Sequence, residues 1–441
     1  MILRFGLPPP MRPVPSLRPQ TYRGMVFAAL GLSYMLVTFH RLCPAVVAVD
    51  MMRDLHAGGA LIGMLSGAFF YSYAFMQLPA GLLADFWGAR RTTSLFYLLA
   101  ALGALGMGLA PDSTWATFGR IFVGLGMSMI WVCTLKTLAE WYPPDRFAAM
   151  TGLLVAVGGA GSLLASAPLA WAAQEFGWRT AFVALSVLSL CLSGMLWIVV
   201  RDTPALAGFK GPDFPHGLTP GRQALMPGVR AVVANRWAWL VAAWLMLDNG
   251  VFFSLAGLWA GPYLSHVHGF SSTQAGFALA MFSVGVISGG PLLSHLSSRV
   301  LKSRKKTLAL SAAALCGLTG LLSWRAGDMG GLELYGVFYL IGIFGGATPA
   351  IGFTTGKELF PISLAGTALG ILNIFPFVGG ALFQPLLGLV LEHYGRGADG
   401  SFTVEGYKAV FLTLSTTSAL LLAVSLSLKE TFLQSTQRHT P

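Results

Sequence analysis

The fold is decided by Gly81-Leu82-Leu83-Ala84-Asp85-Phe86-Trp87-Gly88-Ala89-Arg90-Arg91, a short charged segment between two long apolar runs. The runs cover residues 60–84 and 92–110, and neither contains a charged side chain. About 20 apolar residues are enough for a helix to cross the bilayer core. The segment therefore predicts a short connection between two transmembrane helices, in which glycines permit the reversal of the chain.

The composition points to the same class of protein. Only 10% of the 441 residues are charged and 55% are hydrophobic, whereas soluble domains carry about 25% charged residues. Reading the chain for apolar runs of about 20 residues predicts twelve spans. These spans are 22–46, 60–84, 92–111, 115–137, 148–172, 179–200, 237–262, 273–296, 307–325, 332–356, 364–392 and 406–428.

The net charge of +11 would suggest a nucleic-acid partner in a soluble protein. Here most basic residues fall on one side of the membrane if the spans alternate. Because basic loops stay in the cytoplasm, we expect a multi-pass protein of the cell inner (plasma) membrane with both termini cytoplasmic, and no nucleic-acid partner. The opposite side has only Arg53, Arg179, Arg325, Arg396 and Lys408.

A proline-rich polar interruption at residues 201–236 divides the spans six and six. We expect a disordered cytoplasmic tail at 1–21, which lacks the apolar core of a signal peptide. A six-helix bundle at 22–200, a cytoplasmic linker at 201–236, a second bundle at 237–428 and a tail at 429–441 follow. The second and eighth spans each contain a proline and are each followed by basic residues, which suggests a duplication.

The pattern Gly-x-x-x-Asp-x-x-Gly-x-Arg-Arg at the opening segment resembles the loop between the second and third helices of the major facilitator superfamily. The resemblance implies an all-α membrane transporter with twelve transmembrane helices in two pseudo-symmetric six-helix bundles, and a substrate site between them near mid-membrane. It also implies a conformational gate that locks the halves together on the cytoplasmic side. The gate residues would be Gly81, Asp85, Gly88, Arg90 and Arg91.

Arg41 lies near the outer end of the first span. Its charge cannot be neutralised, so it must face water, a carboxylate or an anionic ligand. Residues 30–180 resemble the anion:cation symporter and organophosphate branches, in which an arginine at this point binds the carboxylate or phosphate of the substrate. The chain departs from that pattern at two positions where those branches have, or often have, an acidic residue. These positions are occupied by His40 and Met127.

Arg120 lies at a similar depth in the fourth span. Two arginines at one depth would repel each other without an anion between them, so the pair predicts an anion site. The alternative is that Arg120 bonds the backbone of a neighbouring helix.

Two titratable groups at membrane depth are candidates for carrying a coupled proton. The unperturbed pKa of histidine, about 6.5, suits proton exchange, although His40 could instead be satisfied by a backbone carbonyl. Asp248 lies near the middle of the seventh span. It could carry a proton, pair with Arg41, or belong to a buried polar network.

Amide and phenol side chains complete the predicted substrate site. Tyr73 and Gln77 are four residues apart and share one helix face, which we expect to line the cavity. Asn373 and Gln384 in the eleventh span are further amide contacts. The cysteines and the His266-x-His268 pair have no metal-ligand spacing, so no metal or cofactor is expected.

These features predict a secondary transporter that works by alternating access, with proton-coupled uptake of a small organic anion, either a carboxylate or a phosphate ester. The alternative is an exporter or facilitator of neutral or zwitterionic molecules such as drugs or dipeptides. No nucleophile–base pair is visible, so an enzyme is not expected. The expected partners are the substrate, protons and the lipid bilayer, and the expected state is a monomer.

Overall fold

A computed structural model describes residues 18–209, 225–361, 364–398 and 400–432. The described residues form helices joined by short connections, with one isolated bridge between Arg396 and Phe402. The first half contains α1 (Pro19–Leu42), α2 (Pro44–Asp54), α3 (Gly59–Trp87), α4 (Ala89–Gly108), α5 (Ser113–Trp141), α6 (Pro144–Leu164), α7 (Ala167–Phe176), α8 (Trp178–Val199) and the short η1 (Pro204–Ala207).

The second half begins with α9 (Leu225–Val233). It continues through α10 (Arg236–Ser254), the π-helix η2 (Leu255–Trp259), α11 (Ala260–His268), α12 (Ser272–His295), the π-helix η3 (Leu296–Val300), α13 (Arg304–Trp324), α14 (Gly331–Ile341), the π-helix η4 (Gly342–Gly346), α15 (Pro349–Glu358), α16 (Ala365–Leu372), α17 (Ile374–Tyr394) and α18 (Val404–Ser427). The expected tail 1–21 and linker 201–236 lie partly outside the described residues.

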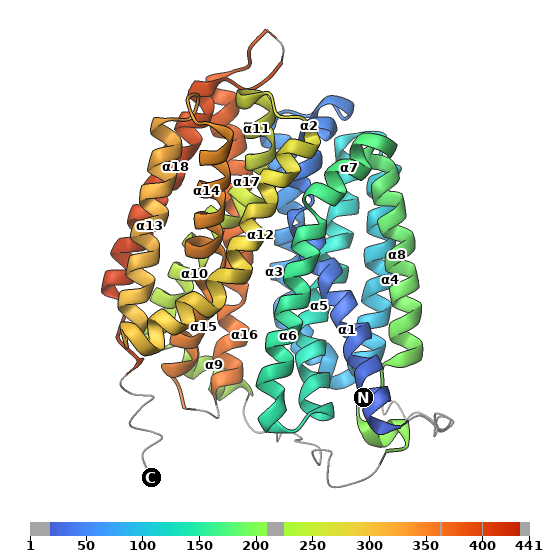
Figure 1. Cartoon of the computed structure of the whole chain (residues 1–441). Coiled ribbons are helices and arrows are strands. Elements are labelled where there is room, and N and C mark those ends of the chain that lie inside the picture. The colour runs from blue at the N-terminus through green and yellow to red at the C-terminus, as the bar shows by residue number, and fades with distance from the viewer. Residues whose placement is uncertain (1–17, 210–224, 362–363, 399, 433–441) are drawn as a thin grey trace.

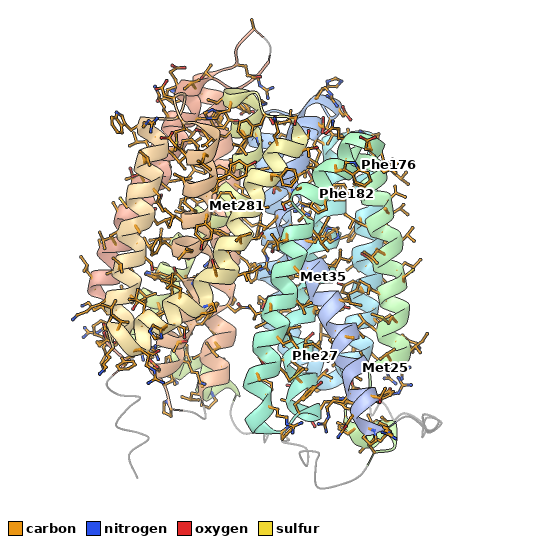
Figure 2. The ribbon with its side chains drawn as sticks, in the orientation of Figure 1. Met25, Phe27, Met35, Phe176, Phe182 and Met281 are labelled. Carbon is orange, nitrogen blue, oxygen red and sulfur yellow. The ribbon has the colours of Figure 1, made fainter. Side chains whose placement is uncertain are left out.

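The helices stand side by side in two groups, α1–α8 and α10–α18 (Figure 1). The start of α1 and the end of α18 lie at the lower edge of this view. We call that edge the inner side and the opposite edge the outer side, following the orientation that the basic residues predict. Apolar side chains such as Met25, near the inner side, and Phe176, near the outer side, lie on the periphery of the bundles (Figure 2), and both are exposed.

Within the described residues, eleven helical segments are long and apolar enough to cross a membrane. The remaining predicted span is the third along the chain, and it corresponds to α4, a 20-residue helix that packs between α5 and α8. The predicted all-α membrane fold is therefore confirmed. The chain is a multi-pass membrane protein.

Several spans are interrupted where the sequence predicted continuous helices. The first span breaks at Cys43, the fifth at Ser166 and the eleventh at Asn373. At the first break Pro44 follows directly, and proline lacks the N–H that would continue the hydrogen-bond ladder. The breaks turn backbone carbonyls and side chains toward neighbouring helices, which matters for the site below.

Glycines bring helices into close contact inside each half. A Cβ on Gly103 of α4 would meet the backbone of Gly119 and Val123 in α5. A Cβ on Gly161 of α6 would meet the carbonyl oxygen of Met35 in α1. Gly161 of the fifth span thus serves helix packing, as small residues commonly do in membranes.

The two halves meet on the outer side and along α3 and α17. Gly63 of α3 packs on the backbone of Gln384, and Gly261 of α11 packs on the carbonyl of Ala45 in α2. On the same side, the Thr273 hydroxyl donates to Gln174 Oε1 over 2.8 Å. These contacts close the outer side, so we interpret the structure as an inward-facing state.

The outer end of α2 is fastened to the first half. Asp54 accepts hydrogen bonds from Trp178 Nε1 at 2.9 Å and from Arg179 at 3.1 Å. Burial raises the pKa of Asp54, but the hydrogen bonds from Trp178 and Arg53 outweigh it and leave the pKa below its ordinary value. The clasp holds α2 in place where it contacts α11.

Candidate functional site

Arg41 lies between the halves inside a cage of aromatic rings. Its guanidinium carbon lies 5.7 Å from the ring centroid of Tyr73, 5.5 Å from that of Phe253 and 5.2 Å from that of Phe377. Tyr73 belongs to the first half, and the two phenylalanines belong to the second. No described carboxylate forms an ion pair with Arg41, and its buried Nε has no described hydrogen-bond partner.

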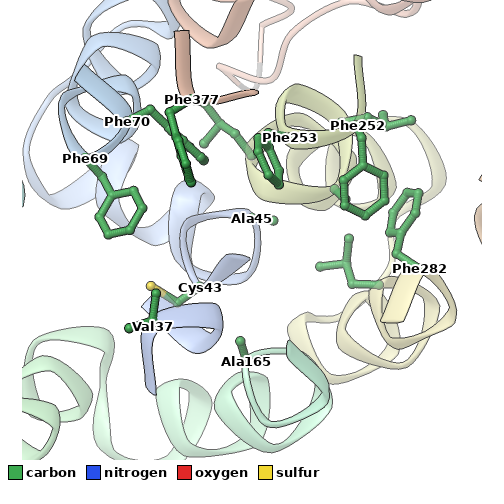
Figure 3. Packing of buried hydrophobic residues seen from close by; sticks show 14 of the residues in the cluster. Val37, Cys43, Ala45, Phe69, Phe70, Ala165, Phe252, Phe253, Phe282 and Phe377 are labelled. Atoms are coloured by element: carbon green, nitrogen blue, oxygen red, sulfur yellow. The ribbon is translucent and has the colours of Figure 1, made fainter. Parts of the chain in front are cut away.

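The cage is part of a larger aromatic cluster, which we define as Phe69, Phe70, Tyr73, Phe253 and Phe377. Phe70 stacks on Phe253 with centroids 5.1 Å apart, and Tyr73 lies 4.1 Å from Phe377. Figure 3 shows Phe70, Phe253 and Phe377 gathered together where the two halves meet. Ring faces carry partial negative charge, so the cluster stabilises the cation of Arg41 without a carboxylate.

The structure brings two predicted amides together across the halves. Asn373 Nδ2 donates to Gln77 Oε1 over 2.8 Å. Gln77 Nε2 in turn lies 3.5 Å from the carbonyl oxygens of Tyr73 and Ser128. The break in the helix at Asn373 places its side chain at this point.

Gln384 has a structural partner. It is fully buried, and its Nε2 donates to the carbonyl of Phe253 over 2.9 Å, where α10 passes into the π-helix η2. Its Oε1 has no partner among the described residues. Gln384 thereby supports the backbone that carries Phe253 into the cage.

Arg120 bonds backbone in this structure, as in the alternative interpretation. Its Nη2 donates to the carbonyl oxygen of His40 over 2.9 Å, and its guanidinium lies 4.9 Å from the Phe69 ring. The side chain is fully buried. Arg120 therefore satisfies a carbonyl at the end of α1 and fixes the position of Arg41 next to it, while its predicted contact with an anion stays a prediction.

His40 is fully buried, and neither ring nitrogen has a hydrogen-bond partner among the described residues. Its ring lies beside Phe39 and Phe182, with ring centroids 6.0 Å and 6.5 Å away. The carbonyl bond expected in the alternative interpretation is absent here, because the backbone of His40, not its ring, forms the contact with Arg120.

Asp248 is fully buried in α10, and neither carboxylate oxygen has a partner in the described part of the chain. It shares a helix face with Trp244 and Phe252. Trp244 bonds Ser425 of α18, and Phe252 contacts Phe282 of α12. Asp248 therefore faces the interior of the second half, and the structure shows no ion pair with Arg41.

The expected gate residues lie at the inner end of α3 and at the start of α4. α3 continues to Trp87, so Gly81 lies within the helix and Gly88, with φ of +83°, makes the turn alone. Asp85 pairs with Lys136 of α5 at 2.7 Å instead of with Arg90. The helix that continues to Trp87 carries Asp85 toward α5, and the role of Asp85 and Arg90 as a gate stays a prediction.

Arg90 contacts the end of the sixth span, while the side chain of Arg91 is exposed. The Arg90 amide donates to Asp202 Oδ1 over 2.8 Å, its Nε donates to the carbonyl of Trp197 over 2.7 Å, and its guanidinium lies 4.4 Å from the Trp197 ring. Asp202 also fills the space beside Gly88. A carboxylate just after α8 thus holds the turn between α3 and α4.

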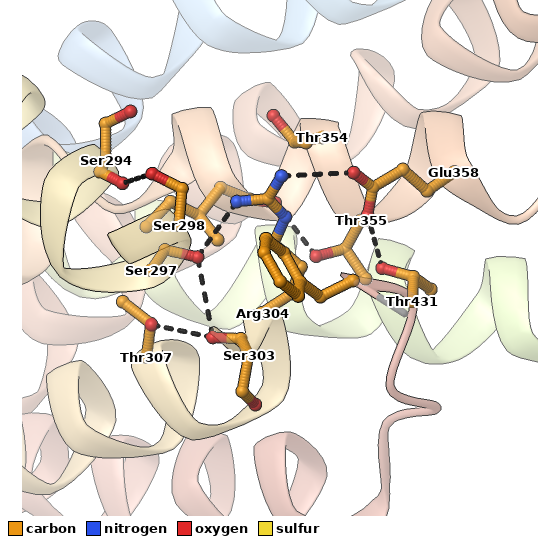
Figure 4. Close-up of polar contacts among 12 residues, drawn as sticks. Ser294, Ser297, Ser298, Ser303, Arg304, Thr307, Thr354, Thr355, Glu358 and Thr431 are labelled. Carbon is orange, nitrogen blue, oxygen red and sulfur yellow. Dashed lines mark hydrogen bonds and ion pairs between the residues drawn. The ribbon is translucent and has the colours of Figure 1, made fainter. Parts of the chain in front are cut away.

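The second half repeats this arrangement around Arg304, which Figure 4 shows beside Glu358. The Arg304 amide donates to Glu430 Oε1 over 3.0 Å, and Ser303 also bonds Glu430. Arg304 forms a largely buried ion pair with Glu358 at 3.2 Å. Glu430 follows α18 as Asp202 follows α8, so the expected C-terminal tail starts with residues that bind the bundle.

Asp85→Asn tests the gate. We expect substrate to bind normally and the transport rate to fall several-fold, because the gate acts when the inner side closes. An exposed pair such as Asp85–Lys136 contributes at most about 1 kcal/mol, so the melting temperature should change little. Uptake, melting temperature and cysteine labelling from the inner side measure these effects. Glu333→Gln, which removes an exposed carboxylate bound to Arg325, is the matched control, and equal rates in both variants would reduce the segment to a simple connection.

A cationic site between two six-helix bundles, with the bundles in contact on the outer side, is the arrangement of a membrane transporter. A family model described as Major Facilitator Superfamily matches residues 26–384 and 250–433. The chain belongs to this superfamily.

Among curated relatives, the chain is 22% identical to the hexuronate transporter of Bacillus subtilis (strain 168), over 84% of this chain and 88% of the relative. It is 24% identical to the glycerol-3-phosphate transporter of the same organism, over 79% of this chain and 81% of that relative. A solved bacterial homologue of the human lysosomal transporter Spinster shares the fold, with a TM-score of 0.74, 19% identity and coverage of 92% and 96%. The resemblance to the anion and organophosphate branches is confirmed.

Sequence reasoning missed the aromatic cage around Arg41 and the two carboxylates that bind the helix turns, Asp202 and Glu430. The chain has 30 phenylalanines, so no single one stood out. The carboxylates did leave a signal. Arg201-Asp202-Thr203 follows the sixth span and Lys429-Glu430-Thr431 follows the twelfth, which is a repeat at equivalent places.

Proposed function

We propose that the protein takes up a small organic anion by alternating access and couples uptake to protons. The observation that carries the proposal is the Arg41 guanidinium, which lies between the halves, partly exposed, with no described carboxylate beside it. A charge of this kind at membrane depth is costly unless an anion or water reaches it.

The named relatives support the class of cargo. They include transporters of hexuronate, glycerol 3-phosphate and, as probable assignments, galactarate/D-glucarate and sulfoacetate. All of these molecules are anions at neutral pH. We place the protein in the inner membrane with both termini cytoplasmic, where an inward-facing Arg41 would release its anion to the cytoplasm.

The site suggests a recognition set with separate tasks. Arg41 would bind the anionic group of the substrate, while Tyr73 and the Gln77–Asn373 pair would contact its body. Gln384 and Arg120 would hold the backbone around the anchor. The turn residues Asp85 and Arg90 would act on conformation from the inner side.

His40→Gln and Asp248→Asn test proton coupling. We expect the variant that lacks the coupling residue to lose substrate accumulation driven by an imposed pH gradient. It should retain counterflow exchange of substrate, because exchange needs no net proton movement. Both side chains are buried with unpartnered polar atoms, so each can take up a proton only when a transport step opens a path. The measurement compares the two assays in proteoliposomes. If both variants still concentrate substrate, the coupling assignment is wrong.

The alternative cargo is a neutral or zwitterionic molecule such as a drug. The aromatic cluster favours this alternative, because it offers apolar contacts. One relative is also named multidrug resistance protein Stp.

Uptake into proteoliposomes under an inward proton gradient tests the proposal. Carboxylates should be accumulated, and their amides should not. Accumulation of amides and acids alike would favour the alternative.

A further inference from the structure

We infer that the cargo is a monocarboxylate with an apolar, ring-bearing body, and not a sugar acid or a phosphate ester. The inference rests on the proposed function and narrows its substrate class. It follows from the charge, the lining and the hydrogen-bonding capacity of the site around Arg41.

Among the described residues around the site, Arg41 is the one cation that is partly exposed and so within reach of a ligand. Arg120 is fully buried and its Nη2 is bound to the His40 carbonyl. On the other side of the site, α10, α16 and α17 contain no lysine or arginine except Arg236 at the first residue of α10. One guanidinium matches one carboxylate. A phosphate monoester carries a charge of about −1.5 to −2 at neutral pH, and a second negative charge would remain unpaired at membrane depth.

The surroundings of the guanidinium are ring faces. Tyr73, Phe253 and Phe377 lie within 5.7 Å of it. On the adjoining helices, the tilted rings of Tyr34 and Trp131 have centroids 5.0 Å apart. When a carboxylate binds Arg41, the body of the ligand must lie against these rings. An apolar ring gains from such contact by desolvation and by offset or edge-to-face packing.

A polyhydroxylated body would lack partners. Each hydroxyl that leaves water without a hydrogen bond costs about 1–3 kcal/mol. Most amide groups nearby are engaged, because Gln77 accepts from Asn373 and lies near two carbonyls, while Gln384 Nε2 donates to the carbonyl of Phe253. Gln384 Oε1 has no partner among the described residues and offers an acceptor for one hydroxyl. A sugar acid with several hydroxyls would have to break the existing amide bonds to satisfy the others, whereas a ring-bearing acid would leave them intact.

The test is a binding panel on the purified full-length protein, with melting temperature and calorimetry as readouts. The probes are benzoate, phenylacetate, D-glucuronate, glycerol 3-phosphate and the neutral amide benzamide. Benzoate or phenylacetate should bind at least about tenfold more tightly than D-glucuronate and glycerol 3-phosphate, which is the discrimination expected from a few unpaired hydroxyls. Benzamide should bind weakly.

Phe377→Leu tests the ring contact and keeps apolar volume. We expect it to weaken the ring-bearing acids by roughly three- to tenfold and to weaken D-glucuronate less, because every anion on Arg41 loses the ring beside the guanidinium but only the ring-bearing acids also lose a contact with their body. The matched control is Phe338→Leu, which removes an equally buried ring that stacks on Phe282 within the second half. The control should bind the ring-bearing acids as the unchanged protein does.

The outcomes separate the inference from the proposed function. Tighter binding of D-glucuronate or glycerol 3-phosphate overturns the inference and leaves anion uptake standing. Equal binding of benzoate and benzamide overturns anion recognition itself. Failure of both ring-bearing acids to bind, or equal effects of Phe377→Leu and Phe338→Leu, also overturns the inference.

Discussion

Arg41→Lys is expected to weaken binding of the anionic substrate by roughly 30- to 1000-fold, a loss of about 2–4 kcal/mol. Lysine keeps the charge but loses the planar fork that matches a carboxylate and the flat face that lies against rings. In the structure that face lies within 5.7 Å of Tyr73, Phe253 and Phe377. Arg41→Ala should abolish detectable binding. Titration calorimetry with the best anion of the panel measures both effects.

The matched control is Arg53→Lys, since Arg53 is largely exposed on the outer side and pairs with Asp50 and Asp54. We expect no change in affinity there. Melting temperatures without substrate show whether each variant folds. Wild-type affinity in folded Arg41→Lys and Arg41→Ala proteins would remove the basis for an anion site.

Gly261→Ala is expected to stop transport while substrate still binds. A Cβ at this position would overlap the carbonyl oxygen of Ala45 across the two halves. Overpacking of this kind costs about 1–3 kcal/mol, which lowers the population of the inward-facing state by roughly 5- to 150-fold. The protein should therefore remain open to the outside. Uptake assays and labelling of a cysteine placed on the outer side measure the two consequences.

Gly336→Ala in α14 is the matched control, because a Cβ there meets no heavy atom within 4 Å. Its transport should equal that of the unchanged protein. The Gly261 contact exists only when the outer side is closed, so folding should survive in both variants. Wild-type transport by Gly261→Ala would mean that α2 and α11 separate enough to accept a methyl group.

The spans could be predicted because each is an apolar run of membrane length, and this signal is local. Their interruptions at Ser166 and Asn373 could not, since a break inside an apolar run depends on how the neighbouring helices pack. The predicted residues Tyr73, Gln77 and Asn373 do converge on the contact between the halves, because polar groups in spans seek one another. Whether they bind substrate remains a prediction.

The pairing of charges was harder to predict. Asp85 and Arg90 are five residues apart, and the sequence suggested that they act together. The structure gives each a partner more than 50 residues away, Lys136 for Asp85 and Asp202 for Arg90. Such partners depend on how four helices, α3, α4, α5 and α8, pack, and no local pattern carries the pairing.

The two carboxylate contacts also bear on the order in which the chain is made. Asp202 follows its partner Arg90 by 112 residues, and Glu430 follows Arg304 by 126. A ribosome delivers each acceptor only after all six helices of that half have left the exit tunnel. During membrane insertion, the connection between the second and third spans of each bundle therefore lacks its carboxylate partner. The last residues of the bundle supply that partner. A chain truncated just before residue 430 would leave the second bundle inserted but unfinished.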